Sequence, residues 1–371
     1  MVFVPAGNIL SRLTKLIPSQ IDEEVLRVPA NALYNTLTVP KEMHALFDKS
    51  SYALSVNGLL AVSIAINGIS KQWDAILPTP SDINESIPFN WHPNLQALLP
   101  PGASTLLAAQ QKKIKFDHDA VTVYFPIVDF ASFVYNWFLV STRTFYYTVP
   151  TAKGKKKAKN EPPLDHDDCI SLAPFADCFN HTSNGTCSVT FSPTGYVLAT
   201  SSAIKKGDEM SISYGNHSND FLLAEYGFIL SSSSGEDNIW DEIPLDFLLL
   251  PLFNDDQKQT LKDAHFLGRY VLDKDGVCYR TQVAVRLLCM SEGKWDKLVA
   301  TGLEGSEKSQ KAVDDVLVRE LKAYMLVIDD HLERVEKEVE GLESQRDTLK
   351  RRWLQIQKLV ENFLAKIEGK S

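Results

Sequence analysis

The stretch SLAPFADCFNHTSNGTC, residues 171–187, changes abruptly from apolar to polar and brings Asp177, Asn180 and His181 within five positions. Three interpretations are open for Asn180-His181: the cap of an ordinary turn, a metal ligand pair, or one wall of a cofactor pocket. The residues around this stretch have to decide between them.

A metal site is the weakest of the three. Zinc takes three or four His, Cys or carboxylate ligands at suitable spacing. Cys178, His181 and Cys187 are the local candidates, but the next cysteine is Cys278 and the chain has no Cys-x-x-Cys or His-x-x-x-His pair. Cys178 also sits in an apolar run, where small buried cysteines are common. We therefore expect no metal.

Composition narrows the class of protein. The chain has 371 residues, of which 44% are hydrophobic and 23% charged, as in a soluble globular protein of two or three domains. Its net charge of −9 argues against general nucleic-acid binding and suits a basic protein partner. No apolar run approaches the roughly 20 residues of a membrane span. Five cysteines without a Cys-x-x-Cys pair indicate reduced thiols, so we expect a cytoplasmic or nuclear protein.

The first half of the chain predicts a strand followed by helices. Residues 21–40, IDEEVLRVPANALYNTLTVP, are typical of a strand that leads into a Pro-bounded connection. Residues 51–115 have mostly helical spacing, broken by prolines. One face of a buried helix is predicted from a run of five apolar residues: Phe130, Phe133, Val134, Trp137 and Phe138.

A basic segment and a β-rich segment follow. Residues 148–167 are polar, flanked by prolines and rich in lysine, and we expect a flexible loop there rather than a nuclear-import or nucleic-acid patch. Residues 187–215 alternate apolar and polar side chains, with turn signals at Pro193-Thr-Gly195 and Lys206-Gly207-Asp208. That pattern predicts short strands and tight turns.

The C-terminal segment predicts long helices. From Leu321 to Ile367 the apolar positions recur at steps of four and three, with Arg346 at one skipped place. A helical hairpin and a self-associating coiled coil both fit. Because few heptads are available, we expect the hairpin, and a monomer.

Two further stretches complete a recognisable order. VSTRTFYY, residues 140–147, precedes Asp177 and Asn180-His181, and GDEMSISYGNHSNDFLLAEYGFIL, residues 207–230, follows them. In this order and spacing the motifs resemble the SET-domain protein-lysine methyltransferases, especially the branch that modifies the Rubisco large subunit and ribosomal proteins. The resemblance also covers EEVLRVPANALYN, residues 23–35, and the stretch around Trp91, and runs from about residue 22 to the end.

The resemblance implies an α+β fold: a SET-domain β-fold with a knotted Asn-His segment, a helical insertion, and an all-α C-terminal domain. The expected parts of the chain are residues 1–50 and 141–240 for the SET domain, 51–140 for the insertion, and 241–371 for a helical domain like that family's substrate-binding domain. The implied function is methyl transfer from S-adenosylmethionine to lysine side chains of a non-histone protein, such as a ribosomal protein.

The family also implies residues for the cofactor and for catalysis. Asn180 and His181 should hold the methionine and adenine portions of the cofactor. Arg143 should lie at the cofactor's carboxylate or at the mouth of the lysine channel. The Tyr214 hydroxyl should orient the methyl group and the amine.

A lysine channel is implied as well. The backbone carbonyls of Thr142 and Asp177 should point at the amine. The walls are expected from aromatic side chains: Tyr147, Tyr226 and Phe228.

Each of these residues also has an ordinary structural interpretation. Tyr214 could end a strand with its hydroxyl in solvent, and Tyr226 with Phe228 could be core. Arg143 could extend from a helix end into solvent. The family order favours the functional interpretation.

Two features depart from the wider family. Its members carry a Gly-x-Gly strand near the start that contacts the cofactor, whereas residues 1–22 contain only Gly7. Either the chain begins late, its gene model is mis-spliced, or it binds cofactor weakly, and the last case predicts a catalytically impaired protein-binding module. The second departure, the lack of a cysteine-rich segment after Tyr226, fits the branch that modifies non-histone proteins.

Overall fold

The computed structural model describes residues 2–5, 11–14, 20–48, 54–147, 169–231, 237–302 and 307–369, with backbone alone for 2–5, 11–14 and 45–48. The chain forms two compact units that interleave along the sequence. The first unit comprises Met1–Asn90, Leu107–Asn216 and Glu225–Gly227, and the second comprises Trp91–Leu106, His217–Ala224 and Phe228–Ser371.

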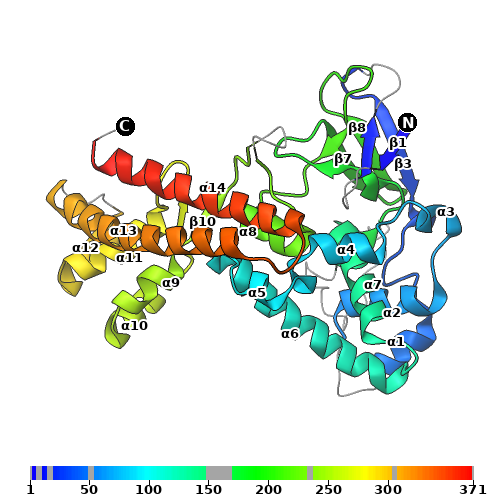
Figure 1. Cartoon of the computed structure of the whole chain (residues 1–371), viewed down its shortest axis with the longest axis horizontal. Helices are drawn as coiled ribbons and strands as arrows, with labels where there is room; N and C mark the ends of the chain where they lie inside the picture. Colours follow the sequence, from blue (N-terminus) through cyan, green and yellow to red (C-terminus); the bar gives the residue numbers. More distant parts are fainter. Residues whose placement is uncertain are drawn as a thin grey trace. The chain divides into compact units, whose positions relative to one another are not determined.

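The strands of the first unit pair into small sheets (Figure 1). A three-stranded antiparallel sheet has the order β3 (Glu24–Pro29), β8 (Gly195–Thr200), β7 (Cys187–Ser192). The other antiparallel pairs are β1 (Val2–Pro5) with β2 (Ser11–Thr14), and β4 (Thr144–Tyr146) with β5 (Ile170–Leu172). One pair is parallel, β6 (Asn180–His181) with β9 (Ser211–Ile212).

The predicted turn at Pro193-Thr-Gly195 joins β7 and β8 into a hairpin. Gly195 has φ 125°, and a Cβ there would lie 2.0 Å from the carbonyl oxygen of Val28 in β3. Only glycine fits a backbone position that is both left-handed and this close to a neighbouring strand. The hairpin is thereby fixed against β3, and its inner face contributes to a small core with Leu198 and Met210.

Helices form the rest of the first unit. They are α1 (Lys41–Asp48), α2 (Val56–Asn67), α3 (Lys71–Asp74), α4 (Pro80–Ser86), most of α6 (Pro101–Tyr124) and α7 (Phe130–Arg143), with short turns η1 (Ala30–Ala32), η2 (Pro88–Asn90) and η4 (Ala176–Cys178). The helices α2 and α7 pack against each other and supply the centre of the core. This core includes four of the five residues predicted for one buried face, whereas Phe130 at the start of α7 is 47% exposed and contacts the edge of His118.

The second unit is mostly helical. Its elements are α5 (Pro93–Gln96), α8 (Asn219–Phe221), β10 (Glu242–Pro244), α9 (Asp246–Leu249), η7 (Leu250–Leu252), α10 (Asp255–Asp263), β11 (Val271–Asp273), α11 (Tyr279–Cys289), α12 (Glu292–Thr301), α13 (Glu307–Lys337) and α14 (Glu343–Ile367). β10 and β11 pair antiparallel. The π-helical turn η5 (Leu222–Tyr226) follows α8, and its last two residues belong to the first unit.

The predicted helical hairpin is present as α13 and α14, which lie side by side (Figure 1). Leu321 and Ile328 of α13 are buried, as are Leu349 and Trp353 of α14. The seam does not run through the connection between the helices, because Val339 there is 81% exposed. The regular spacing of apolar residues therefore predicted both helices correctly, but it wrongly included the exposed connection between them.

A buried arginine ties distant segments of the second unit together. Arg352 of α14 is completely buried, and its guanidinium lies 2.6 Å from Asp220 of α8 and 2.6 Å from Asp241. Burial raises the pKa of the Asp220 carboxyl, and the charge of Arg352 opposes that shift. One buried carboxylate, Asp220, and one largely buried carboxylate, Asp241, therefore depend on the same guanidinium.

These elements confirm the predicted fold class, mixed helix and strand with a helical C-terminal domain. That domain was predicted to be all-α, and it also contains the short β10–β11 pair. The predicted boundaries near residues 50, 140 and 240 stay predictions, as does the knot in the Asn-His segment. The predicted flexible loop, residues 148–167, lies outside the described residues, as does Gly7.

The Arg352 cluster makes a prediction about stability. Arg352→Met should lower the free energy of unfolding by about 3–5 kcal/mol at pH 7, because it leaves Asp220 and Asp241 buried without their cation. The loss should shrink toward pH 5, since a carboxyl with a raised folded-state pKa gains a proton there and no longer needs a partner. Urea denaturation at both pH values measures this.

The matched control is Arg334→Met on α13, where an exposed ion pair with Asp330 is 3.4 Å long. That change should stay within about 0.5 kcal/mol. Equal losses in the two variants would show that the buried cluster contributes nothing special.

Candidate active site

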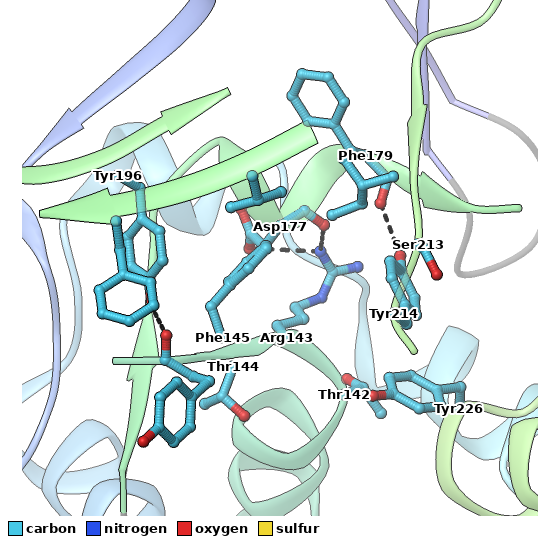
Figure 2. A pocket seen from close by; sticks show the side chains of 14 residues that line it. Thr142, Arg143, Thr144, Phe145, Asp177, Phe179, Tyr196, Ser213, Tyr214 and Tyr226 are labelled. Carbon is cyan, nitrogen blue, oxygen red and sulfur yellow. Dashed lines mark hydrogen bonds and ion pairs between the residues drawn. The ribbon is translucent and has the colours of Figure 1, made fainter. Parts of the chain in front are cut away.

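A cavity of about 280 Å³ opens in the first unit. This volume is close to the lower end of small-molecule pockets, roughly 300–1,000 Å³. The cavity lies between the end of α7, β4, η4, the β7–β8 hairpin and the chain after β9 (Figure 2). Its lining residues are Thr142, Arg143, Thr144, Phe145, Tyr146, Asp177, Phe179, Val189, Phe191, Tyr196, Ile212, Ser213, Tyr214 and Tyr226.

Arg143 is the last residue of α7 and turns into the protein. Its NH1 donates to the backbone carbonyl of Asp177 at 2.8 Å and lies 3.4 Å from Asp177 Oδ2 (Figure 2). The Arg143 side chain is 6% exposed and the Asp177 side chain not at all. Burial raises the pKa of the Asp177 carboxyl, and Arg143 opposes that shift. The alternative of an arginine extended into solvent is therefore wrong.

A strained turn precedes Asp177. Phe175 has φ 67°, a left-handed conformation that costs an aromatic residue roughly 1–2 kcal/mol. It stands at the N-terminus of η4, and its ring is 47% exposed. The turn sends Asp177 inward, so the surrounding fold must hold the strained conformation in place.

Tyr214 is held at both ends by the Asn-His segment. Its backbone N–H donates to His181 Nδ1 at 3.0 Å, and the two rings stack with centroids 5.1 Å apart. Its hydroxyl donates to the carbonyl of Phe179 at 2.7 Å (Figure 2). The predicted alternative of a hydroxyl in solvent is therefore wrong.

The phenols of Tyr214 and Tyr226 are neutral at physiological pH. Desolvation raises the pKa of Tyr214 above its ordinary value, against the opposing charge of Arg143. Tyr226, whose ring centroid is 5.1 Å from that of Tyr214, has its pKa raised to about 12, mainly by desolvation. Both hydroxyls therefore act as hydrogen-bonding groups and not as bases.

Neither Asn180 nor His181 lines the cavity, although His181 stacks on the ring of Tyr214. Their strand β6 pairs with β9, and the Asn180 amide donates to Glu209 Oε1 at 2.6 Å. β2 lies beside both β6 and η4, which places the N-terminal hairpin near Asn180. Their assignment to the cofactor stays a prediction.

The predicted channel residues divide into three groups. Thr142, Asp177 and Tyr226 line the cavity, and the Asp177 carbonyl already accepts a hydrogen bond from Arg143. Tyr147 is buried among Phe191 and Tyr196 and does not belong to the lining. Phe228 belongs to the second unit, and its role stays a prediction.

Several lining residues were missed. Val189 and Phe191 of β7 both face the cavity, and their period-two spacing next to a turn signal could have indicated this. Tyr146 lines the cavity where Tyr147 was expected, and its carbonyl accepts from the Tyr196 hydroxyl at 2.6 Å. Nothing in the sequence pattern points to Trp73, whose indole N–H donates to Asp177 Oδ2 at 3.0 Å across 104 positions.

The described ranges contain no group of three or more His, Cys, Asp or Glu side chains placed to hold a metal ion. In the same ranges, no helix combines the length and apolar character needed to cross a membrane.

Comparison with known proteins gives relatives of this chain. Residues 241–366 match the family model described as Ribosomal lysine N-methyltransferase 2 C-terminal domain. The chain is 26% identical over 323 residues to Ribosomal lysine N-methyltransferase set11 of Schizosaccharomyces pombe, which covers 84% of this chain and 79% of that protein. It is 24% identical over 234 residues to Ribosomal lysine N-methyltransferase 2 of Saccharomyces cerevisiae, which covers 58% of this chain but only 46% of that protein.

Solved structures share the fold. The structure of Rubisco LSMT bound to AdoMet has a TM-score of 0.63 at 16% identity and covers 99% of this chain and 89% of that one. The SET domain of LSMT bound to lysine and AdoHcy has a TM-score of 0.58 at 15% identity, with 99% and 88% covered.

The raised phenol pKa values are testable by spectroscopy. Tyrosinate absorbance near 295 nm should show no contribution from Tyr214 or Tyr226 below about pH 10.5, because both pKa values lie above the ordinary value of about 10. The measurement is the difference titration of the unmodified protein against Tyr214→Phe and Tyr226→Phe, with circular dichroism to follow unfolding. A titration near pH 10 that either substitution removes would show that water reaches the phenol.

Proposed function

We propose that this chain transfers a methyl group from S-adenosylmethionine to a lysine of a ribosomal protein. Its relatives support the family, which is that of the SET-domain protein-lysine methyltransferases. The comparisons support the enzyme class and the cofactor. The ribosomal substrate is what the names of two relatives state for those proteins. The observation that carries the proposal is the Tyr214 phenol, fixed by Phe179 and His181 at a cavity that Arg143 also lines.

The residues of this site fit the cofactor. S-adenosylmethionine combines a sulfonium cation, a carboxylate and an adenine ring, and when bound it supplies the electrophilic methyl group. A guanidinium suits a carboxylate, so Arg143 is a candidate to hold that end. Aromatic faces attract cations, and Tyr214 and Tyr226 present such faces in the cavity. Asn180 and His181 would hold the remaining portions.

The cavity favours the neutral form of a lysine. A free lysine has a pKa near 10.4, so only about one in a thousand is neutral near pH 7.4. The desolvation that raises the pKa of Tyr214 and Tyr226 opposes any charge formed there. The same effect lowers the pKa of an entering ammonium group. The cavity thus favours the reactive, neutral form of the substrate amine without a dedicated base.

Tyr214 orients that amine. Its hydroxyl donates a hydrogen bond to the Phe179 carbonyl, so the hydroxyl oxygen can still accept a hydrogen bond from an N–H of the lysine. Accepting one N–H fixes the direction of the nitrogen lone pair. Catalysis of this kind depends on alignment and on preorganised dipoles.

The partner is a protein that presents a lysine, and the acidic net charge of −9 suits a basic one. Cytoplasm and nucleus stay the predicted compartments, and a monomer the predicted state. The alternative, a catalytically impaired protein-binding module, is decided by the next experiment.

The test is methyl transfer to ribosomal proteins. The purified chain, tritiated cofactor and ribosomal proteins from cells lacking this protein should give labelled methyllysine on hydrolysis. Tyr214→Phe should lower kcat about 10²–10³-fold, because it removes an aligning hydroxyl, while the cofactor Kd changes by no more than about threefold. Tyr324→Phe, a buried tyrosine of α13 in the second unit, is the matched control and should keep full turnover. Saturable cofactor binding with no labelling of any protein would favour the binding module, and full turnover of Tyr214→Phe would remove Tyr214 from the reacting centre.

A second prediction concerns cofactor affinity. Asn180→Ala should raise the Kd of S-adenosylmethionine at least about tenfold, because a lost hydrogen bond in a binding site costs roughly 1–3 kcal/mol. Isothermal titration of the folded variant measures this. Asn84→Ala, an asparagine of α4 that does not line the cavity, is the control. An unchanged Kd would return Asn180-His181 to the interpretation of an ordinary turn.

A further inference from the structure

We infer that Trp73 is a positioning residue for this reaction: its indole N–H fixes the Asp177 carboxylate, which in turn fixes Arg143 in the cavity wall. The inference rests on the proposed function for its kinetic consequence, although its geometric part does not. It gives a role to α3, a four-residue helix far from the site in sequence.

The three groups meet at one oxygen. Trp73 is 4% exposed, and its Nε1 donates to Asp177 Oδ2 at 3.0 Å. The same oxygen lies 3.4 Å from Arg143 NH1, which also donates to the Asp177 carbonyl at 2.8 Å. An indole N–H has no other polar function when buried, so its direction fixes the rotation of the carboxylate.

The surroundings of Asp177 make that donor important. The charged and titratable groups that face it are Arg143, the neighbouring Cys178, whose sulfur is 3.9 Å from Oδ1, and Tyr214. Burial raises the pKa of the carboxyl, while Arg143 and the Trp73 N–H oppose the shift. Without the N–H, protonation becomes easier, and a neutral carboxyl no longer anchors a guanidinium.

The effect reaches the reacting residues through Arg143. Figure 2 shows its guanidinium between Asp177 and the ring of Tyr214. Its charge opposes the rise that desolvation causes in the pKa of Tyr214, so the two groups interact electrostatically. A shift of Arg143 therefore changes both the shape of the cavity and the field at the Tyr214 hydroxyl.

The first unit contains a matched control. Trp137 of α7 is 2% exposed, and its indole N–H donates to the fully buried Asp117 at 3.3 Å. Neither residue lines the cavity. Trp137→Phe thus removes the same kind of hydrogen bond and the same side-chain volume as Trp73→Phe, away from the site.

The kinetic experiment compares kcat/KM of Trp73→Phe and of the unmodified protein on one substrate, from the most acid pH at which both proteins stay folded up to about pH 9. Titration of the substrate amine cancels in the ratio of the two. We expect a deficit of about tenfold at the acid end that narrows as pH rises, because Asp177 in the variant then regains its charge. Trp137→Phe should show no pH-dependent deficit. A Trp73→Phe ratio that is flat with pH, or no deficit, overturns the kinetic role.

A measurement without turnover separates this inference from the proposed function. The Asp177 carboxyl carbon can be assigned by NMR through Asp177→Asn and titrated in both proteins. Its midpoint should lie higher in Trp73→Phe than in the unmodified protein and should not move in Trp137→Phe. An unmoved midpoint in Trp73→Phe overturns the inference. An unmodified protein that methylates nothing but shows the shifted midpoint overturns only the proposed function.

Discussion

The parallel pairing of β6 with β9 is the constraint on which the candidate site depends. Each of these strands has only two residues, which is too short a pairing to be stable by itself. Side-chain hydroxyls add to it: Thr182 Oγ1 lies 3.0 Å from Ser211 Oγ, and the Ser211 N–H donates to Thr186 Oγ1 at 2.8 Å. Gly185 has φ 61°, and a Cβ there would lie 3.0 Å from the backbone nitrogen of Ser213 and 3.1 Å from the carbonyl carbon of Ile212, so the left-handed backbone and the tight fit beside β9 both favour glycine. Tyr214 is placed only because β9 is placed.

Buried charge serves the same purpose in each unit. Asp177 with Arg143 joins η4 to α7, and Arg352 with Asp220 and Asp241 joins α14 to α8 and to the chain before β10. Such pairs add little net stability, because desolvation offsets attraction. Their geometric demand is strict, however, since a misplaced partner leaves a charge unpaired in a low dielectric. We infer that these pairs specify where the segments lie more than they strengthen the fold.

The sequence predicted what depends on short-range pattern and failed where distant segments meet. Helical period predicted α7, α13 and α14, and alternation with turn residues predicted the β7–β8 hairpin. The resemblance to the methyltransferase family implied that Arg143, Asp177 and Tyr214 lie together, and all three line the cavity. The sequence could not show that Tyr146, and not Tyr147, faces the cavity. Successive residues of an extended segment face opposite sides, and the register of β4 is fixed only by its pairing with β5. Trp73 was invisible for a similar reason, since its contact spans 104 positions.

The neutral state of Tyr214 decides what kind of chemistry this site can perform. A phenol whose pKa lies above its ordinary value cannot remove a proton at neutral pH, so its contribution has to be directional. Direction is set by the Phe179 carbonyl, by His181 and by the field of Arg143, and Arg143 is in turn fixed by Asp177. In a site of this kind the rate of the chemical step depends on how rigidly the aligning groups are held in position, because a small displacement of such a group lowers the rate steeply. We infer that helix α3, through the indole N–H that Trp73 donates to Asp177, helps to hold this arrangement, as does β9, which Tyr214 follows.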